Sequence, residues 1–134
     1  MDWVMQKATE LGAASIVPII SERVIARPRS ERLGVQQKRW QRIVFEAAQQ
    51  AERWEVPNVH PSAEFLAWLR SSSGKLKLIL SERSDEGGLG TIALPEHTES
   101  RILLVIGPEG GWSGAERDAA HACGFTSVSL GPRI

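Results

Sequence analysis

The chain has 134 residues, of which 42% are hydrophobic and 24% charged, and its formal net charge is zero. This length predicts one domain with a buried core, and no apolar run approaches the roughly 18 residues that a membrane span needs. The N-terminus lacks a secretory signal and the single cysteine, Cys123, has neither a disulfide partner nor metal-ligand spacing around it, so we expect a reducing, cytoplasmic location.

Charge is unevenly distributed along the chain. Residues 21–42 contain seven Lys or Arg against two Glu, whereas residues 82–99 contain five Asp or Glu against one Arg. A basic segment can attract a polyanion even when the protein is neutral overall, although a solvated face produces the same clustering. The distribution therefore leaves both nucleic-acid contact and a plain solvated surface open.

The N-terminal residues predict a helix followed by a strand. Four apolar residues recur on one helical face and are expected to point inward: Trp3, Val4, Ala8 and Leu11. Gly12 follows as the C-terminal cap. The apolar, β-branched run at residues 15–20 predicts a strand, in which Pro18 favours an edge position because it has no N–H to donate.

The clearest helix is predicted over residues 36–52. Its inward positions recur at i, i+3, i+4, i+7, i+8 and i+11, at Trp40, Ile43, Val44, Ala47, Ala48 and Ala51. Pro61 and Ser62 are expected to open a shorter helix. The inward face of that second helix is predicted to consist of Phe65, Leu66 and Leu69.

Three tryptophans in this part of the chain are large enough to stack on a nucleic-acid base. Helical spacing favours core positions for Trp40 and Trp68. Trp54 lies outside the helical periodicity, so it remains a candidate for base stacking.

The rest of the chain alternates strands with a helix. Three apolar runs predict strands, at residues 76–80, 102–106 and 125–130. Ser113 and Glu116 form a capping box before a helix at residues 114–123, and Gly124 ends it. This alternation predicts an α/β fold with a parallel sheet covered by helices on both faces, in which ligands bind beyond the carboxyl ends of the strands.

The segment IGPEGGWSGAE, residues 106–116, joins a predicted strand to a predicted helix. Its glycines permit unusual backbone angles and close approach of a ligand, and a helix N-terminus offers unpaired N–H groups. It matches no known phosphate-loop pattern, lacks a lysine and contains Glu109, whose carboxylate would repel a phosphate. The segment therefore favours a neutral or cationic ligand, with a tight turn that binds nothing as the alternative.

Four separated blocks of the sequence resemble one known family. They are KATELGAASIVPIISER (residues 7–23), RWQRIVFEAAQQAER (39–53), LLVIGPEGGWSGAE (103–116) and GFTSVSLGPRI (124–134). In this order, and with similar spacing, they resemble the ribosomal RNA small subunit methyltransferase E family, which belongs to the SPOUT superfamily of trefoil-knot methyltransferases. The resemblance runs from end to end of the chain.

The resemblance implies that a homodimer methylates the N3 atom of a uridine in small-subunit (16S) ribosomal RNA with S-adenosylmethionine as cofactor. In this superfamily the cofactor lies in loops that follow three neighbouring strands. The matching positions here are Leu80, Ser81, Ile106, Gly107, Pro108, Glu109, Gly110, Gly111, Leu130 and Gly131. Because a sulfonium cofactor is positively charged, a loop with one carboxylate suits it where it would not suit a phosphate.

The resemblance also implies catalytic roles for Arg23, Arg53 and Glu109, and RNA contacts for Arg23, Arg53 and Arg133. An arginine can stabilise the negative charge that develops when uridine N3 loses its proton, and a carboxylate or a water can accept that proton. Two alternatives stay open. Arg23 can pair with Glu22 or another carboxylate at the surface, and Glu109 can brace its own loop through a backbone hydrogen bond.

The sequence departs from the family in three respects. Glu52 stands next to Arg53 where the family has a small residue. The family also carries an N-terminal PUA-like RNA-binding domain and a C-terminal segment that threads the knot and leads to the dimer interface, so we expect residues 1–134 to form a methyltransferase domain that is incomplete at its C-terminus. The alternatives are a non-catalytic RNA-binding module of the same fold and a doubly wound nucleotide-binding domain. The scattered histidines predict no metal site.

Overall fold

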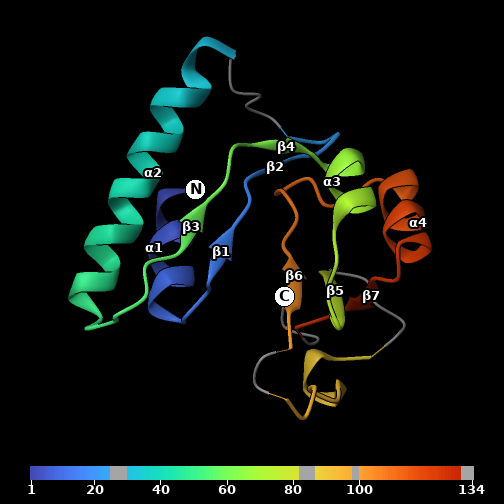
Figure 1. The fold of residues 1–134 in the computed structure, drawn as a ribbon. Helices are drawn as coiled ribbons and strands as arrows, with labels where there is room; N and C mark the ends of the chain where they lie inside the picture. Colours follow the sequence, from blue (N-terminus) through green and yellow to red (C-terminus); the bar gives the residue numbers. More distant parts are fainter. Residues whose placement is uncertain (25–29, 82–86, 98–99, 131–134) are drawn as a thin grey trace. The chain divides into compact units, whose positions relative to one another are not determined.

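The computed structural model describes residues 1–24, 30–81, 87–97 and 100–130. These residues form two compact units, one with residues 1–20 and 30–63 and the other with residues 21–24 and 64–130. Figure 1 shows the helices and strands of each unit, coloured along the sequence. In the described part of the chain, no helix is both long and apolar enough to cross a membrane.

The first unit is built on two helices, α1 (Asp2–Glu10) and α2 (Ser30–Gln50), which lie against each other (Figure 1). Their core consists of Met5, Trp40, Val44 and Val59, with the partly buried Ile16 and Ile43 packed against it. Two short parallel strands, β1 (Ser15–Ile16) and β3 (Asn58–Val59), supply the remaining part of this core. Full burial of each such apolar side chain contributes about 1.5–3 kcal/mol.

Helix α2 confirms the periodicity read from the sequence. Trp40, Val44, Ala47 and Ala48 are buried, as predicted, and the Trp40 ring N–H donates to the Asp2 carboxylate at 3.2 Å. The assignment of Trp40 to the core is therefore confirmed. The helix begins at Ser30, earlier than the predicted residue 36, and it ends at Gln50.

The predicted inward face of α1 is wrong at two of its four residues, whereas Val4 and Ala8 are half-buried. Trp3 is 69% exposed and Leu11 is 87% exposed, whereas Met5 and Thr9 are fully buried. Thr9 can occupy the core because its hydroxyl donates to the Met5 carbonyl at 2.7 Å, which leaves no unpaired polar group. The cap at Gly12 is confirmed, with φ of 91° and an N–H that donates to the Thr9 carbonyl at 3.0 Å.

The strand predicted at residues 15–20 is divided in two. β1 pairs with β3, whereas β2 (Ile19–Ile20) forms a separate two-stranded sheet with β4 (Ala63–Glu64). Pro18 lies between them, and its carbonyl accepts the Ala63 N–H at 3.0 Å. The sequence did not predict β3 or β4, because strands of two residues are too short to show an alternating pattern.

The second unit contains a three-stranded parallel sheet in the order β6-β5-β7. Its elements in chain order are α3 (Phe65–Ser71), β5 (Leu76–Leu80), the 3-10 helix η1 (Leu89–Thr91), β6 (Ile102–Val105), α4 (Gly114–Ala122) and β7 (Thr126–Val128). Helices α3 and α4 are in contact. The predicted α/β class with parallel strands and flanking helices is confirmed, although the described strands are shared among three small sheets.

Aromatic rings form much of the core of the second unit. Phe65 stacks on Trp112 with ring centroids 4.4 Å apart, and Trp68 lies 5.9 Å from the Phe125 ring. Trp68 was predicted to lie in the core, and the structure places it half-buried at the edge of this aromatic cluster. The prediction for α3 needs two corrections, because the helix begins at Phe65 and Leu66 on it is 45% exposed.

Candidate active site

The parallel register brings the carboxyl ends of three strands to one edge of the sheet. Ile79 of β5 pairs with Val105 of β6, and Leu80 of β5 pairs with Val128 of β7. The Ser81 N–H continues this pattern by donating to the Val128 carbonyl at 3.0 Å. The three segments predicted to hold a cofactor therefore leave the sheet side by side. Such an edge is where open parallel sheets bind their ligands.

Segments that follow β5 and β7 also meet further along the chain. The Leu89 N–H donates to the Ser129 carbonyl at 2.8 Å, and the Ser129 N–H donates to the Gly87 carbonyl at 3.3 Å. This pairing keeps the two connections together beyond the ends of their strands. Gly131 and Arg133, which were predicted for cofactor and RNA, lie outside the described residues.

The glycine segment, residues 106–111, is anchored to β5 by the tryptophan that follows it. The Trp112 ring N–H donates to the Leu80 carbonyl at 2.9 Å, and the indole is almost completely buried. The Gly111 N–H donates to the Pro108 carbonyl at 2.9 Å and closes a turn in which Gly111 has φ of 65°. Trp112 was not among the residues predicted from the sequence, although a tryptophan directly after a glycine segment is a visible signal.

Arg23 lies on the glycine segment. One of its guanidinium nitrogens, Nη1, donates to the Gly110 carbonyl at 3.1 Å. A Cβ atom at Gly110 would lie only 3.3 Å from the Arg23 Cβ and 3.4 Å from the Arg23 carbonyl oxygen. Within the described residues Arg23 forms no ion pair, so the alternative of a surface pair with Glu22 or another carboxylate is not observed there.

Glu109 is exposed on the same segment. Its carboxylate has no hydrogen bond or ion pair among the residues that the structure describes, so the proposed loop-bracing bond is not observed there. The segment thus presents backbone groups, one carboxylate and the nearby guanidinium of Arg23. The carboxylate suits a cationic group of a ligand, and the guanidinium suits an anionic one.

The N-terminus of α4 is less open than the sequence predicted. The capping box is confirmed: the Ser113 N–H donates to Glu116 Oε2 at 2.9 Å, and the Glu116 N–H donates to Ser113 Oγ at 3.3 Å. Two N–H groups that were expected to be available to a ligand are therefore already paired. This pairing, together with Glu109, argues against a phosphate-binding loop.

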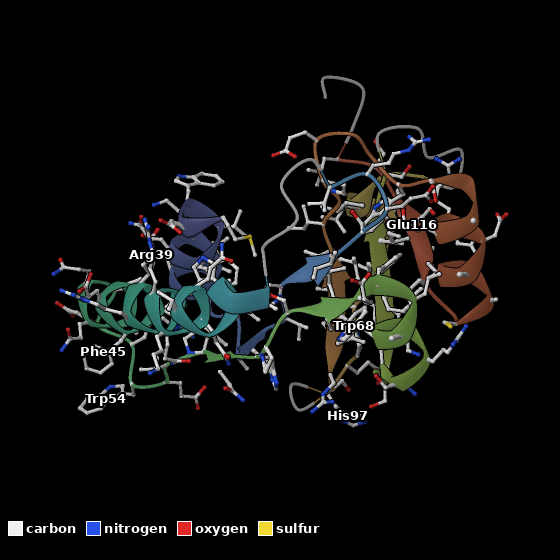
Figure 2. The ribbon with its side chains drawn as sticks, turned by 90° about the horizontal axis from the view of Figure 1, so that it is seen from above. Arg39, Phe45, Trp54, Trp68, His97 and Glu116 are labelled. Atoms are coloured by element: carbon white, nitrogen blue, oxygen red, sulfur yellow. The ribbon has the colours of Figure 1, made fainter. Side chains whose placement is uncertain are left out.

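Sequence reasoning missed a second role of Glu116, which is 4% exposed at the start of α4 (Figure 2). Its other carboxylate oxygen, Oε1, accepts the Glu22 N–H at 2.8 Å. These two residues are 94 positions apart in the chain. No local pattern signals such a contact, because the capping box alone explains a glutamate at this position.

Arg53 belongs to the first unit, just after α2. Its guanidinium lies over Gly12, where a Cβ atom would be 2.8 Å from the Arg53 Nη2. A surface hollow of about 310 Å³ is lined by Gln49, Glu52, Arg53 and Trp54. Trp54 is fully exposed and projects from the end of the helix (Figure 2). An exposed indole beside a guanidinium can take part in base stacking and phosphate contact.

The other titratable groups add little to this site. Among the described residues, His, Cys, Asp and Glu do not gather into a group of three that would hold a metal ion. On α1, a 2.6 Å hydrogen bond from Lys7 holds the pKa of the Glu10 carboxyl below its usual value. Both side chains are partly exposed on a helix surface, so this pair concerns local stability.

Parallel strands that end together beside a glycine segment, with helices around them, define a domain of the α/β class. Residues 1–134 match the family described as RNA methyltransferase domain, and the chain belongs to this family. The resemblance noted from the sequence is thereby confirmed.

Curated relatives of this chain carry the name of the family that its four sequence blocks resemble. The ribosomal RNA small subunit methyltransferase E of Synechocystis sp. is 38% identical over 98% of this chain and 43% of the relative. The Bacillus subtilis protein of that name is 32% identical over 100% of this chain and 54% of the relative. The chain thus spans about half the length of these curated relatives.

Solved structures of methyltransferases are similar to this chain in both fold and sequence. A ribosomal RNA small subunit methyltransferase E from Neisseria gonorrhoeae, bound to S-adenosyl methionine, has a TM-score of 0.87 and 39% identity, over 99% of this chain and 54% of that one. A methyltransferase from Legionella pneumophila, solved with bound SAM, has a TM-score of 0.88 and 32% identity, over 100% of this chain and 54% of that one. The fold is that of the SPOUT methyltransferases, as predicted.

Proposed function

We propose that residues 1–134 act as one methyltransferase domain and that the protein methylates uridine N3 in small-subunit ribosomal RNA with S-adenosylmethionine. The observation that carries this proposal is the placement of Arg23 on the glycine segment, at the edge where three strands end. The family match and the neighbours solved with the cofactor support it. Such a protein works in the cytoplasm, and we propose that it does so as a homodimer.

The residues at the strand ends fit the cofactor. Backbone groups after Leu80, Val105 and Val128 converge there, and Glu109 supplies one carboxylate with no described partner. When bound, S-adenosylmethionine supplies an activated methyl group on a positively charged sulfur. We propose that the positions predicted from the sequence hold it, from Leu80 and Ser81 through the glycine segment to Leu130 and Gly131.

The chain's own residues then position the uridine and stabilise its charge. Holding the two reactants in line removes most of the entropic cost of their encounter. In our proposal Arg23 stabilises the negative charge that spreads to the ring carbonyls as N3 loses its proton. Glu109 or a water accepts that proton. Arg53 and Arg133 contact the RNA, whose phosphates attract guanidinium groups.

Nucleoside mass spectrometry of small-subunit ribosomal RNA tests this proposal. We expect 3-methyluridine to disappear on deletion of the full-length gene and to return with the intact gene or with an Arg117→Ala variant, since Arg117 is an exposed arginine on α4. Arg23→Ala is expected to restore little, because loss of one such donor lowers kcat about 10²- to 10³-fold. Unchanged 3-methyluridine on deletion would refute the uridine assignment and favour the non-catalytic RNA-binding module.

A further inference from the structure

Glu116 uses both of its carboxylate oxygens inside the second unit. Oε2 accepts the Ser113 N–H at 2.9 Å, which completes the local capping box. Oε1 accepts the Glu22 N–H at 2.8 Å. The side chain is 4% exposed, and a buried carboxylate persists only when hydrogen bonds replace its hydration. The local cap needs one oxygen, so the second oxygen is available to hold a distant segment.

The distant segment is a tight turn that carries Arg23. The Val24 N–H donates to the Ser21 carbonyl at 3.4 Å, and Ser21 is buried. Glu116 holds this turn by the N–H of Glu22, and the next side chain, Arg23, then reaches the Gly110 carbonyl at 3.1 Å. The turn is therefore attached at one point to the start of α4 and at another to the glycine segment.

We infer that Glu116 is a positioning residue, which fixes the turn at residues 21–24 so that Arg23 lies on the glycine segment during methyl transfer. The geometry of this inference comes from the two carboxylate contacts of Glu116. Its catalytic consequence rests on the proposed function, in which Arg23 takes part in methyl transfer. A neutral amide cannot replace the carboxylate. Both contacts need an acceptor facing an N–H, and an amide offers one acceptor and one donor.

Hydrogen exchange at the Glu22 amide, followed by NMR in the full-length protein, tests the positioning. Glu116→Ala removes both carboxylate contacts and is expected to speed this exchange about 10- to 100-fold, the range for losing a hydrogen bond to a charged acceptor. Ser113→Ala is the matched control, because it removes the hydroxyl half of the capping box and leaves both carboxylate contacts in place. Unchanged exchange at Glu22 in Glu116→Ala would overturn the inference.

Methyl-transfer kinetics test whether the position of Arg23 contributes to catalysis. We expect Glu116→Ala to lower kcat about tenfold or more, and Ser113→Ala to lower it much less. On an Arg23→Ala background, Glu116→Ala should cause less than a roughly twofold further loss, because its effect passes through Arg23. A full additional loss on that background would contradict the inference. A wild-type protein without methyl transfer would refute the proposed function instead, and the exchange at Glu22 would still decide whether Glu116 holds the turn.

Discussion

Gly110 is a residue at which the site leaves little room for a side chain. An alanine there would place its Cβ 3.3 Å from the Arg23 Cβ, closer than ordinary van der Waals contact, and 3.4 Å from the Arg23 carbonyl oxygen. We therefore predict that Gly110→Ala displaces Arg23 and lowers kcat for methyl transfer about 10- to 100-fold. The Arg23 amide signal in an NMR spectrum should shift as well.

Gly111 provides the comparison for this prediction. It has φ of 65°, but a Cβ there would meet nothing within 4 Å. Gly111→Ala should therefore cost about 1–2 kcal/mol of unfolding free energy through backbone strain and leave the Arg23 amide signal in place. An equal shift of that signal in both variants would contradict the steric explanation.

At the scale of the element, helices α1, α2 and α4 are each followed by a residue in the left-handed conformation, and after α2 this residue is not a glycine. After α1 and α4 the left-handed residue is glycine, at Gly12 and Gly124, whereas after α2 it is Glu52 with φ of 52°. The Arg53 N–H donates to the Ala48 carbonyl at 2.9 Å, which is the bond that defines this cap. Glu52 is thus held in the left-handed backbone conformation, which is strained for a residue that has a Cβ atom.

We predict that Glu52→Gly raises the free energy of unfolding by about 0.5–1 kcal/mol. Relief of the left-handed strain, about 1–2 kcal/mol, exceeds the extra chain entropy that glycine loses on folding. Gly124→Ala is the matched control, because a Cβ there meets nothing within 4 Å, and it should lower stability by about 1 kcal/mol. Urea denaturation measures both changes, and a loss of stability in Glu52→Gly would show that this cap is not strained.

At the scale of the whole molecule, the net charge of these 134 residues is zero, so the RNA binding that we propose must depend on local groups. Arg53 and Trp54 are neighbours on one hollow and should give different signatures with a small-subunit ribosomal RNA fragment. Arg53→Gln should weaken binding and reduce the slope of log affinity against log salt by about 0.7, the value for one phosphate on a single strand. Trp54→Ala should weaken binding about 5- to 100-fold with an unchanged slope, because stacking on a base is not ionic.

Trp3→Ala is the control for this RNA-binding test, because Trp3 is also largely exposed, on α1, and was not assigned an RNA contact. Fluorescence anisotropy at several salt concentrations measures affinity and slope together. Equal losses for Trp3→Ala and Trp54→Ala would mean that the hollow is not an RNA contact.

Local features of this protein were determined by the sequence alone. The caps at Gly12 and Gly124, the box of Ser113 and Glu116, and the buried stripe of α2 depend on residues no more than a few turns apart, so their spacing predicts them. The predicted strand at residues 76–80 matches β5 for the same reason. The glycine segment was also visible, because few other contexts require three glycines between a strand and a helix.

Only the tertiary structure decided which distant residues meet. The buried face of α1 was decided by its packing on α2 rather than by its own periodicity, and the division of residues 15–20 depended on partners more than forty positions away. Arg23 and Gly110 are 87 positions apart, and Glu22 and Glu116 are 94 apart. Contacts of this kind leave no periodic trace, because the free energy that makes them comes from bringing distant segments of one unit together around its core.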